Sequence, residues 1–337
     1  MKFAISYSTP FNGTDPDRLT RFAQHAEECG FEALYVQDHI ALYPGASYGA
    51  GQLPATLPYF DPLDCLSFVA AATRRLLLGT GVLLLPYRHP VVLAKRLATI
   101  DVLSKGRMRL LTVGIGALPG EARAVGVDFR TRGRRADEAI DVLRLLWSGG
   151  PDGVGYHGEF YDFDDLCSYP KPSNVKELPI HVGGSSRAAA RRAGLRGNGY
   201  FAGGMLAEAE RDLQMEAARR AAAEAGRDPA ALEYTRWGSA DLSVEEVGRL
   251  EEHGVTRIVV NPTAASAAEQ HDTMSAFAER FGLATTQSSW GDRRGRPGHD
   301  RLGATLPPVD SPCRVTAPEP GRITPYGRST SPDRFPG

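Results

Sequence analysis

The sequence has few cysteines and almost no net charge. Four cysteines occur among 337 residues, none of them forms a CxxC pair, and no cysteine and histidine residues have zinc-ligand spacing. We therefore expect isolated thiols in a reducing cytoplasm and no metal site. Lysine and arginine number 39 against 40 acidic residues, which gives a formal charge of −1. This balance gives no reason to expect nucleic acid or an anionic membrane surface as a partner.

Long hydrophobic segments are lacking as well. The N-terminus, MKFAISYSTP, contains no apolar run of signal-peptide length. The longest apolar stretch, residues 76–85, is interrupted by glycines and a threonine and is too short to cross a bilayer. We expect a cytoplasmic protein that acts on a small molecule. The chain has 337 residues, 42% of them hydrophobic, and can therefore form a large core without disulfide bonds.

Residues 1–283 alternate between short apolar segments and amphipathic segments. In the first unit an apolar strand is followed by Asp15, a good N-cap, by Pro16 at the first helical position, and by Gly30 at the helix end. The predicted strands are 2–8, 31–37, 76–85, 107–115, 179–182, 199–202, 232–238 and 257–260. The predicted helices are 16–30, 61–73, 91–103, one around 136–146, 185–193, 206–225, 243–253 and 266–281.

Eight strands that alternate strictly with eight helices predict parallel strands and a closed (β/α)8 barrel. An irregular insertion, residues 148–178, precedes the fifth strand and contains a hairpin pattern around 156–163. A doubly wound open sheet is the alternative fold. That fold places a glycine-rich dinucleotide loop after the first strand, and the segment between Tyr7 and Asp15 has no GxGxxG motif.

The composition changes after Leu283. Residues 284–337 contain nine prolines, seven glycines and eight arginines but no lysine, and the apolar periodicity ends. This composition is typical of a disordered segment. We therefore predict one barrel domain, residues 1–283, and a disordered tail, residues 284–337.

Six segments in the first 283 residues together resemble the luciferase-like monooxygenase superfamily, particularly its actinobacterial F420-dependent branch. They are AEECGFEALYVQDH (26–39), the stretch 70–108 around LLLGTGVLLLPYRHP, the stretch 113–147 that begins VGIGALPGE, LPIHVGGSSRAAARRAGLRGNGYFAGG (178–204), AGRDP (225–229) and HGVTRIVV (253–260). The resemblance implies a (β/α)8 barrel with an insertion before strand five, which agrees with the strand count. It also implies coenzyme F420, with FMN as the alternative cofactor, and a homodimer.

Asp38 and His39 directly follow the second predicted strand, and residues just beyond the C-terminal strand ends face the active site of a barrel. Spacing alone also allows Asp38 to cap the next segment while His39 packs. The resemblance favours the first interpretation, because this acid–histidine pair lines the deazaflavin site in the family. A neutral imidazole can donate or accept a proton beside a flavin.

The third and fourth strands carry glycines that the resemblance assigns to the cofactor. In many family members a cis peptide bond between non-proline residues supports the flavin ring, and the matching bond is Gly81–Val82. We also assign Leu84 in this strand to the cofactor site. After strand four, Ile115 and Gly116 match residues that contact the ring and the ribityl chain. A plain barrel glycine that avoids a clash is the alternative interpretation of Gly81.

Gly183, Gly184 and Ser185 lie between strand five and its helix. Backbone N–H groups at a helix N-terminus bind anions, and glycines allow a phosphate to approach closely. We therefore predict that this loop binds the cofactor phosphate, with Arg187 as a further contact. An ordinary serine N-cap after a glycine turn is the alternative. The family's usual aspartate before the glycine of strand six is Asn198 here, so its role is open.

One departure from the family concerns the reaction. Sugar-phosphate dehydrogenases of this family have a glutamate general acid after the second glycine of the fourth-strand loop, and Ala117 stands there. The sequence therefore argues against that activity, and His39 and Tyr43 are the candidate catalytic residues. Tyr43 and Arg88 are the candidate substrate contacts. We expect Glu121, which matches a family glutamate, to pair with Arg132 or Arg134.

The long loop after strand two carries Tyr43, Tyr48, Tyr59 and Phe60, and long barrel loops often act as lids. The sequence hypothesis is an F420-dependent oxidoreductase that transfers a hydride between C5 of the deazaflavin and a small organic substrate. One alternative is an FMN-dependent monooxygenase that activates O2. The other is a barrel that binds the cofactor without turnover.

Overall fold

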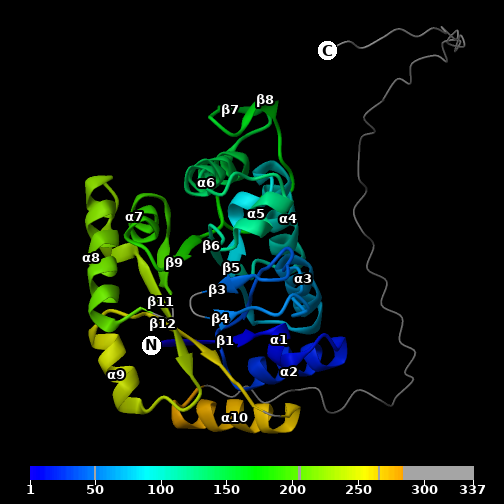
Figure 1. Ribbon diagram of the computed structural model, residues 1–337, viewed down its shortest axis with the longest axis vertical. Helices are drawn as coiled ribbons and strands as arrows, with labels where there is room; N and C mark the ends of the chain where they lie inside the picture. Colours follow the sequence, from blue (N-terminus) through cyan, green and yellow to red (C-terminus); the bar gives the residue numbers. More distant parts are fainter. Residues whose placement is uncertain (49–50, 204–205, 265, 284–337) are drawn as a thin grey trace, which may run out of the picture. The chain divides into compact units, whose positions relative to one another are not determined.

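The computed structural model describes residues 1–48, 51–203, 206–264 and 266–283. In this part of the chain eight parallel strands form a closed barrel in the order β1-β12-β11-β10-β9-β6-β5-β2, and β2 pairs with β1 to close the circle. The predicted barrel is therefore confirmed (Figure 1). The barrel strands are β1 (Lys2–Tyr7), β2 (Ala33–Val36), β5 (Leu77–Leu84), β6 (Met108–Gly114), β9 (Ile180–Gly184), β10 (Gly199–Ala202), β11 (Glu233–Ser239) and β12 (Arg257–Asn261).

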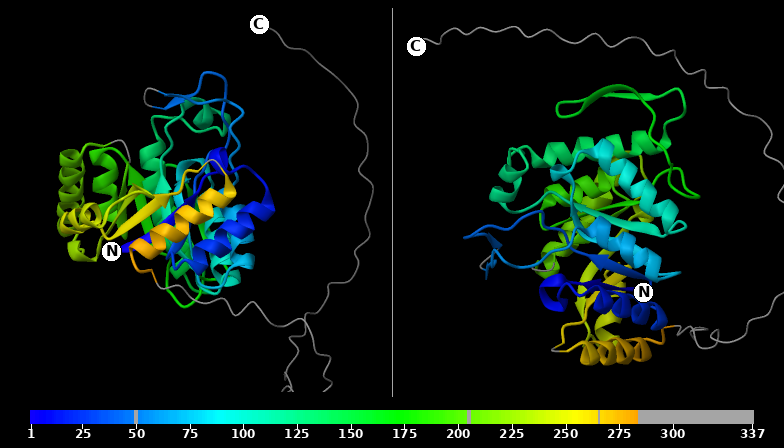
Figure 2. Two further views of the ribbon diagram at one scale, coloured as in Figure 1. Left: turned by 90° about the horizontal axis from the view of Figure 1, so that it is seen from below. Right: turned by 90° about the vertical axis from the view of Figure 1, so that its right-hand side faces the viewer.

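Helices surround the barrel (Figures 1 and 2). They are α2 (Pro16–Glu28), α3 (Pro62–Ala72), α4 (Pro90–Leu103), α6 (Arg132–Ser148), α7 (Arg187–Arg196), α8 (Glu208–Glu224), α9 (Val244–Glu252) and α10 (Ala267–Arg280). Local sequence explains where several begin. Asp15 and Asp61 accept backbone N–H bonds as N-caps before a proline, and Ser243 and Ser266 form capping boxes with Glu246 and Glu269.

Several short elements were not predicted. They are the helices α1 (Thr9–Asn12) and α5 (Pro119–Ala124), the 3-10 turns Leu85–Tyr87 and Pro229–Ala231, and the hairpin formed by β3 (Ser47–Tyr48) and β4 (Gly51–Gln52). The β3–β4 hairpin projects from the barrel (Figure 2). In the predicted insertion, β7 (Val154–His157) and β8 (Asp162–Leu166) form the expected hairpin. The predicted tail, residues 284–337, lies outside the described residues. Within the described part of the chain, no helix is both long enough and apolar enough to span a membrane.

The N-terminal end of the barrel is filled by ionised side chains. Arg257, only 1% exposed, donates to Glu32 over 2.7 and 3.0 Å and to Glu233 over 2.7 Å. Nε2 of His181 lies 3.5 Å from Glu233. Burial lowers the pKa of His181 to about 4. Burial alone would raise the pKa of Glu233, but hydrogen bonds from Arg257 and Lys2 lower it to about 2. This end therefore closes the barrel rather than forming a binding site.

Aromatic side chains fill the barrel interior above that closed end. The rings of Phe201 and Trp237 lie 4.9 Å apart, and Tyr35 meets Phe201 edge to face. A Cβ atom at Gly81 would lie 3.3 Å from the Tyr35 ring and 3.4 Å from the Trp237 ring. The absence of a side chain at Gly81 thus lets β5 pass over these rings, which form the floor of the C-terminal mouth.

Candidate active site at the C-terminal mouth of the barrel

The predicted cofactor residues come together at one part of the barrel rim. Asp38 and His39 follow β2, Gly81, Val82 and Leu84 lie in β5, Ile115 and Gly116 follow β6, and Gly183, Gly184 and Ser185 end β9 or follow it. The order β2-β5-β6-β9 is continuous in the barrel. All these residues therefore lie along one contiguous arc at the end where barrel enzymes place their active sites.

Val82 lies at the centre of that arc, and its peptide bond with Gly81 is cis, as the resemblance predicts. The Val82 side chain occupies space left by two neighbouring strand ends. A Cβ atom at Gly114 would lie 2.5 Å from Cγ2 of Val82, and one at Gly183 would collide with Cγ1. Both glycines are therefore required by the position of Val82, whose methyl groups occupy the space beside them.

Asp38 links the ends of β2 and β5. It is 5% exposed, and its carboxylate accepts the N–H of Leu84 over 2.9 Å and the Arg88 guanidinium over 2.9 and 3.0 Å. Burial raises the pKa of Asp38, and the Arg88 charge opposes that rise. Arg88 also donates to Asp61 over 2.8 Å and its side chain is 14% exposed. Arg88 is therefore neither solvated nor free, and its contacts join the strand ends to the start of α3.

The structure corrects the expected partner of Glu121. Instead of pairing with Arg132 or Arg134, Glu121 contacts the segment after β2. Its carboxylate lies 3.3 and 3.4 Å from Nδ1 of His39 and accepts the Ile40 N–H over 2.6 Å. Arg134 pairs with Glu159, while Arg132 donates to backbone carbonyls and lies over the Phe129 ring. The cause is α5, which turns Glu121 towards residues 39–41.

The loop after β2 places two tyrosines beside this group. Tyr43 accepts the N–H of Gly120 over 3.2 Å, and its ring fills the space beside that glycine, where a Cβ atom would collide with it. The ring of Tyr59 meets His39 edge to face at 4.7 Å. Tyr48, by contrast, is 56% exposed. Of the aromatic residues in this loop, Tyr43 and Tyr59 therefore lie at the His39 group, and Tyr48 is exposed to solvent.

Sequence reasoning missed Tyr87. Its hydroxyl is buried without a hydrogen-bond partner among the described residues, and burial raises its pKa to about 12. Gly116 has a φ of 77°, and a Cβ atom there would collide with this hydroxyl. Gly116 therefore serves both a left-handed turn and a close approach to Tyr87. The only sequence signal was the position of Tyr87 directly before Arg88 at the exit of β5.

Side chains of β10 and α8 hold the turn after β9 in place. Tyr200 donates to the Gly184 carbonyl over 2.8 Å, and Gln214 donates to the Ser185 carbonyl over 3.3 Å. Ser186 is the N-cap of α7, and its side chain accepts the N–H of Ala189 over 3.2 Å. The structure thus contains the ordinary serine cap, and phosphate binding by Gly183, Gly184 and Ser185 stays a prediction. Arg187, 73% exposed, lies 3.5 Å from Glu210.

Asn198 lies away from this mouth, immediately before β10 begins. Its side-chain oxygen accepts the N–H of Ile180 and a guanidinium N–H of Arg144, each over 3.0 Å. It therefore joins the beginnings of two strands to α6, and the loss of the family's aspartate charge falls outside the candidate site.

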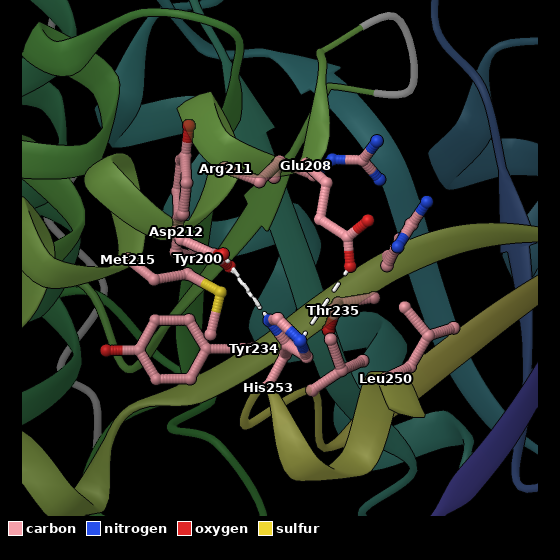
Figure 3. A pocket seen from close by; sticks show the side chains of 12 residues that line it. Tyr200, Glu208, Arg211, Asp212, Met215, Tyr234, Thr235, Leu250 and His253 are labelled. Carbon is pink, nitrogen blue, oxygen red and sulfur yellow. Dashed lines mark hydrogen bonds and ion pairs between the residues drawn. The ribbon is translucent and has the colours of Figure 1, made fainter. Parts of the chain in front are cut away.

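A separate small hollow lies outside the barrel, between α8, α9 and the outer faces of β10 and β11 (Figure 3). His253 lies there, 3.4 Å from Asp212 and 3.8 Å from Glu208. The hollow encloses about 20 Å³, which is the space of about one water molecule. This hollow is too small to hold a deazaflavin.

Comparisons with known proteins agree with the barrel fold. The family model described as luciferase-like monooxygenase matches residues 1–248. An uncharacterised protein of Mycobacterium tuberculosis is 33% identical over 245 residues, which cover 71% of this chain and 82% of the relative. An F420-dependent glucose-6-phosphate dehydrogenase of Kribbella flavida is 30% identical over 270 residues, 73% of this chain and 77% of the relative.

Among solved structures, an F420-dependent secondary alcohol dehydrogenase in complex with an F420–acetone adduct superposes with a TM-score of 0.68. The match covers 84% of this chain and 99% of the other, at 19% sequence identity. At that identity the likeness supports the fold alone.

Proposed function

The chain is an oxidoreductase that belongs to the luciferase-like monooxygenase family, and we propose that it uses coenzyme F420 to transfer a hydride to or from a small organic substrate. The observation that carries the proposal is the contiguous arc at β2, β5, β6 and β9, found in a chain 30% identical to an F420-dependent dehydrogenase over 270 residues. When bound, the deazaflavin supplies or accepts the hydride at C5, and the protein binds, orients and shields it.

The residues of the arc fit a flat ring with a phosphorylated chain. Gly81, Gly114 and Gly116 make room for the side chains of Tyr35, Val82 and Tyr87, because a Cβ atom at each glycine would meet them. The half-buried residues Val82 and Ile115 offer a surface against which a ring can lie. The turn Gly183–Ser185 offers backbone N–H groups for a phosphate.

The groups available for proton transfer lie beside this surface. His39 has a side chain 23% exposed, so its imidazole is accessible to a substrate. Tyr43 accepts a backbone N–H and keeps its own hydroxyl hydrogen for donation. Ala117 is exposed and has no acidic group. We therefore propose that the substrate is a small molecule other than a sugar phosphate, handled by His39 and Tyr43, while Asp38 and Arg88 hold the strand ends in place.

The test is equilibrium binding of F420 and of FMN to the full-length protein, followed by fluorescence quenching of each cofactor. Quenching of F420 at micromolar concentration, with FMN ignored, supports the proposal. A preference for FMN would assign the chain to the oxygen-activating monooxygenases of the family. Tight F420 binding without hydride exchange with any enone, imine or alcohol would instead indicate a barrel without turnover.

Gly114→Ala supplies the matched variant for this assay, because its methyl group would enter the space of Val82. Gly248→Ala is its control, since Gly248 lies in α9 with no heavy atom within 4 Å of an added Cβ. Only the first variant should weaken F420 binding. Light scattering tests the homodimer that we also propose, with an expected mass twice the 36.4 kDa of one chain.

A further inference from the structure

Glu121 forms a more constrained group with the segment after β2 than an ordinary surface ion pair does. Its side chain is fully buried, and Oε1 accepts the N–H of Ile40 over 2.6 Å and that of Ala41 over 3.4 Å. Oε2 lies 3.3 Å from Nδ1 of His39. The two N–H donors belong to the residues that directly follow His39. These hydrogen bonds therefore hold the Glu121 carboxylate beside the His39 imidazole.

The chemistry of the two groups determines which nitrogen carries the hydrogen. An ionised carboxylate has only acceptor sites, so Nδ1 of His39 must donate to Glu121. A neutral imidazole has one donor and one acceptor nitrogen, so Nε2 becomes the acceptor. The Tyr59 ring, edge to face with His39 at 4.7 Å, restricts rotation of the imidazole. Within the described residues Nε2 has no hydrogen-bond partner.

We propose that Glu121 is a positioning residue that holds His39 in the Nδ1–H tautomer, so that Nε2 presents its lone pair at the barrel mouth as the proton acceptor. The inference deepens the proposed function and rests on it for the role of Nε2 in turnover. The tautomer itself requires no cofactor. When Nε2 takes up a proton, the resulting imidazolium lies against the Glu121 carboxylate, which stabilises its charge.

The structure suggests a substitution that reverses the tautomer rather than merely removing a contact. In Glu121→Gln the amide oxygen can replace Oε1 and keep the N–H bonds from Ile40 and Ala41. The amide nitrogen then takes the place of Oε2 and donates to Nδ1, which forces the hydrogen of His39 onto Nε2. The substitution therefore keeps the backbone attachment and inverts the donor and acceptor nitrogens.

The experiment is 15N NMR of the histidine-labelled full-length protein at about pH 8, where a free imidazole is neutral. A His39→Gln spectrum identifies the His39 signals. We expect the Nδ1–H form to predominate by at least about tenfold in the wild type, and the Nε2–H form to predominate in Glu121→Gln. The matched control is Glu27→Gln, because Glu27 also accepts backbone N–H groups, from Leu76 at 2.8 Å and from Arg74 at 2.9 Å, and lies away from His39.

Two results would overturn the inference. One is a wild-type His39 that carries its hydrogen on Nε2, a result that needs no variant to fold. The other is a tautomer ratio that stays the same in Glu121→Gln, or that Glu27→Gln changes equally. Failure of F420 binding with the expected tautomers would reject only the proposed function. A merely structural Glu121 would change the melting temperature of the variant but not its His39 tautomer.

Discussion

The sharpest prediction concerns the space shared by Val82 and Gly114. An alanine at position 114 would place its Cβ atom 2.5 Å from Cγ2 of Val82 and 3.2 Å from Cβ of Val82. Carbon atoms in contact normally lie about 3.5–4.0 Å apart, so the valine must move by about 1 Å. Valine has few χ1 rotamers, and its other methyl group already lies against Gly183. Overpacking of this kind costs about 1–3 kcal/mol of the free energy of unfolding.

A double-mutant cycle with Val82→Ala isolates that contact. The second substitution removes Cγ2 and leaves only the tight 3.2 Å contact with Cβ of residue 82, so Gly114→Ala should cost about 2 kcal/mol alone and less than about 1 kcal/mol in the Val82→Ala background. Urea denaturation measures the free energies, with Gly248→Ala as the control. Additive effects within about 0.5 kcal/mol would show that the two side chains do not share this space, and the reasoning about the arc would then be wrong.

Three further predictions concern stability. The pKa of His181 is about 4 in the folded protein against about 6.5 in the unfolded chain, so the unfolded chain binds more protons below pH 6.5. The contribution of His181 to the free energy of unfolding is therefore complete above pH 6.5 and should fall by about 2 kcal/mol by pH 5. Urea titrations at several pH values measure this pH dependence, and His181→Gln should reduce it. Arg88→Met leaves the buried Asp38 carboxylate unpaired and should cost about 3–5 kcal/mol, with partial recovery in Asp38→Asn/Arg88→Met; an unchanged melting temperature would contradict the pairing. Ser266→Ala removes the capping box of α10 and should cost about 1 kcal/mol, whereas equal stability by calorimetry would show that the cap contributes nothing.

The barrel could be predicted from sequence because its signals are local. Asp15 and Pro16 mark the start of α2, and the apolar run that forms β5 has no competing helical pattern. The strand ends then placed Asp38, Gly81 and Gly183 on one rim without any knowledge of side-chain contacts. Parallel strands in a closed barrel make that inference independent of exact element boundaries.

The partners of the charged groups could not be predicted in this way. Glu121 contacts residues 40 and 41, which lie about 80 positions earlier in the sequence. It does so from a six-residue helix that begins with Pro119 and Gly120, a pair whose sequence suggests a turn. Arg88 likewise meets Asp38 across 50 positions and Asp61 across 27. Among the described residues Tyr87 has no polar partner that a pattern could indicate, and only the left-handed turn at Gly116 shows where its hydroxyl lies.

The restriction of the candidate cofactor residues to β2, β5, β6 and β9 has an evolutionary consequence. The remaining four strands, β10, β11, β12 and β1, are also contiguous in the barrel. Of their rim loops, those after β11 and β12 can accumulate substitutions without touching the proposed support of the deazaflavin ring, whereas the loop after β10 contacts Gly184 through the N–H of Gly203. Sequence changes in these loops can therefore alter which substrate is bound, while the residues proposed to hold the cofactor stay the same. Randomising the loop after β11 should therefore diversify substrate choice at constant F420 affinity.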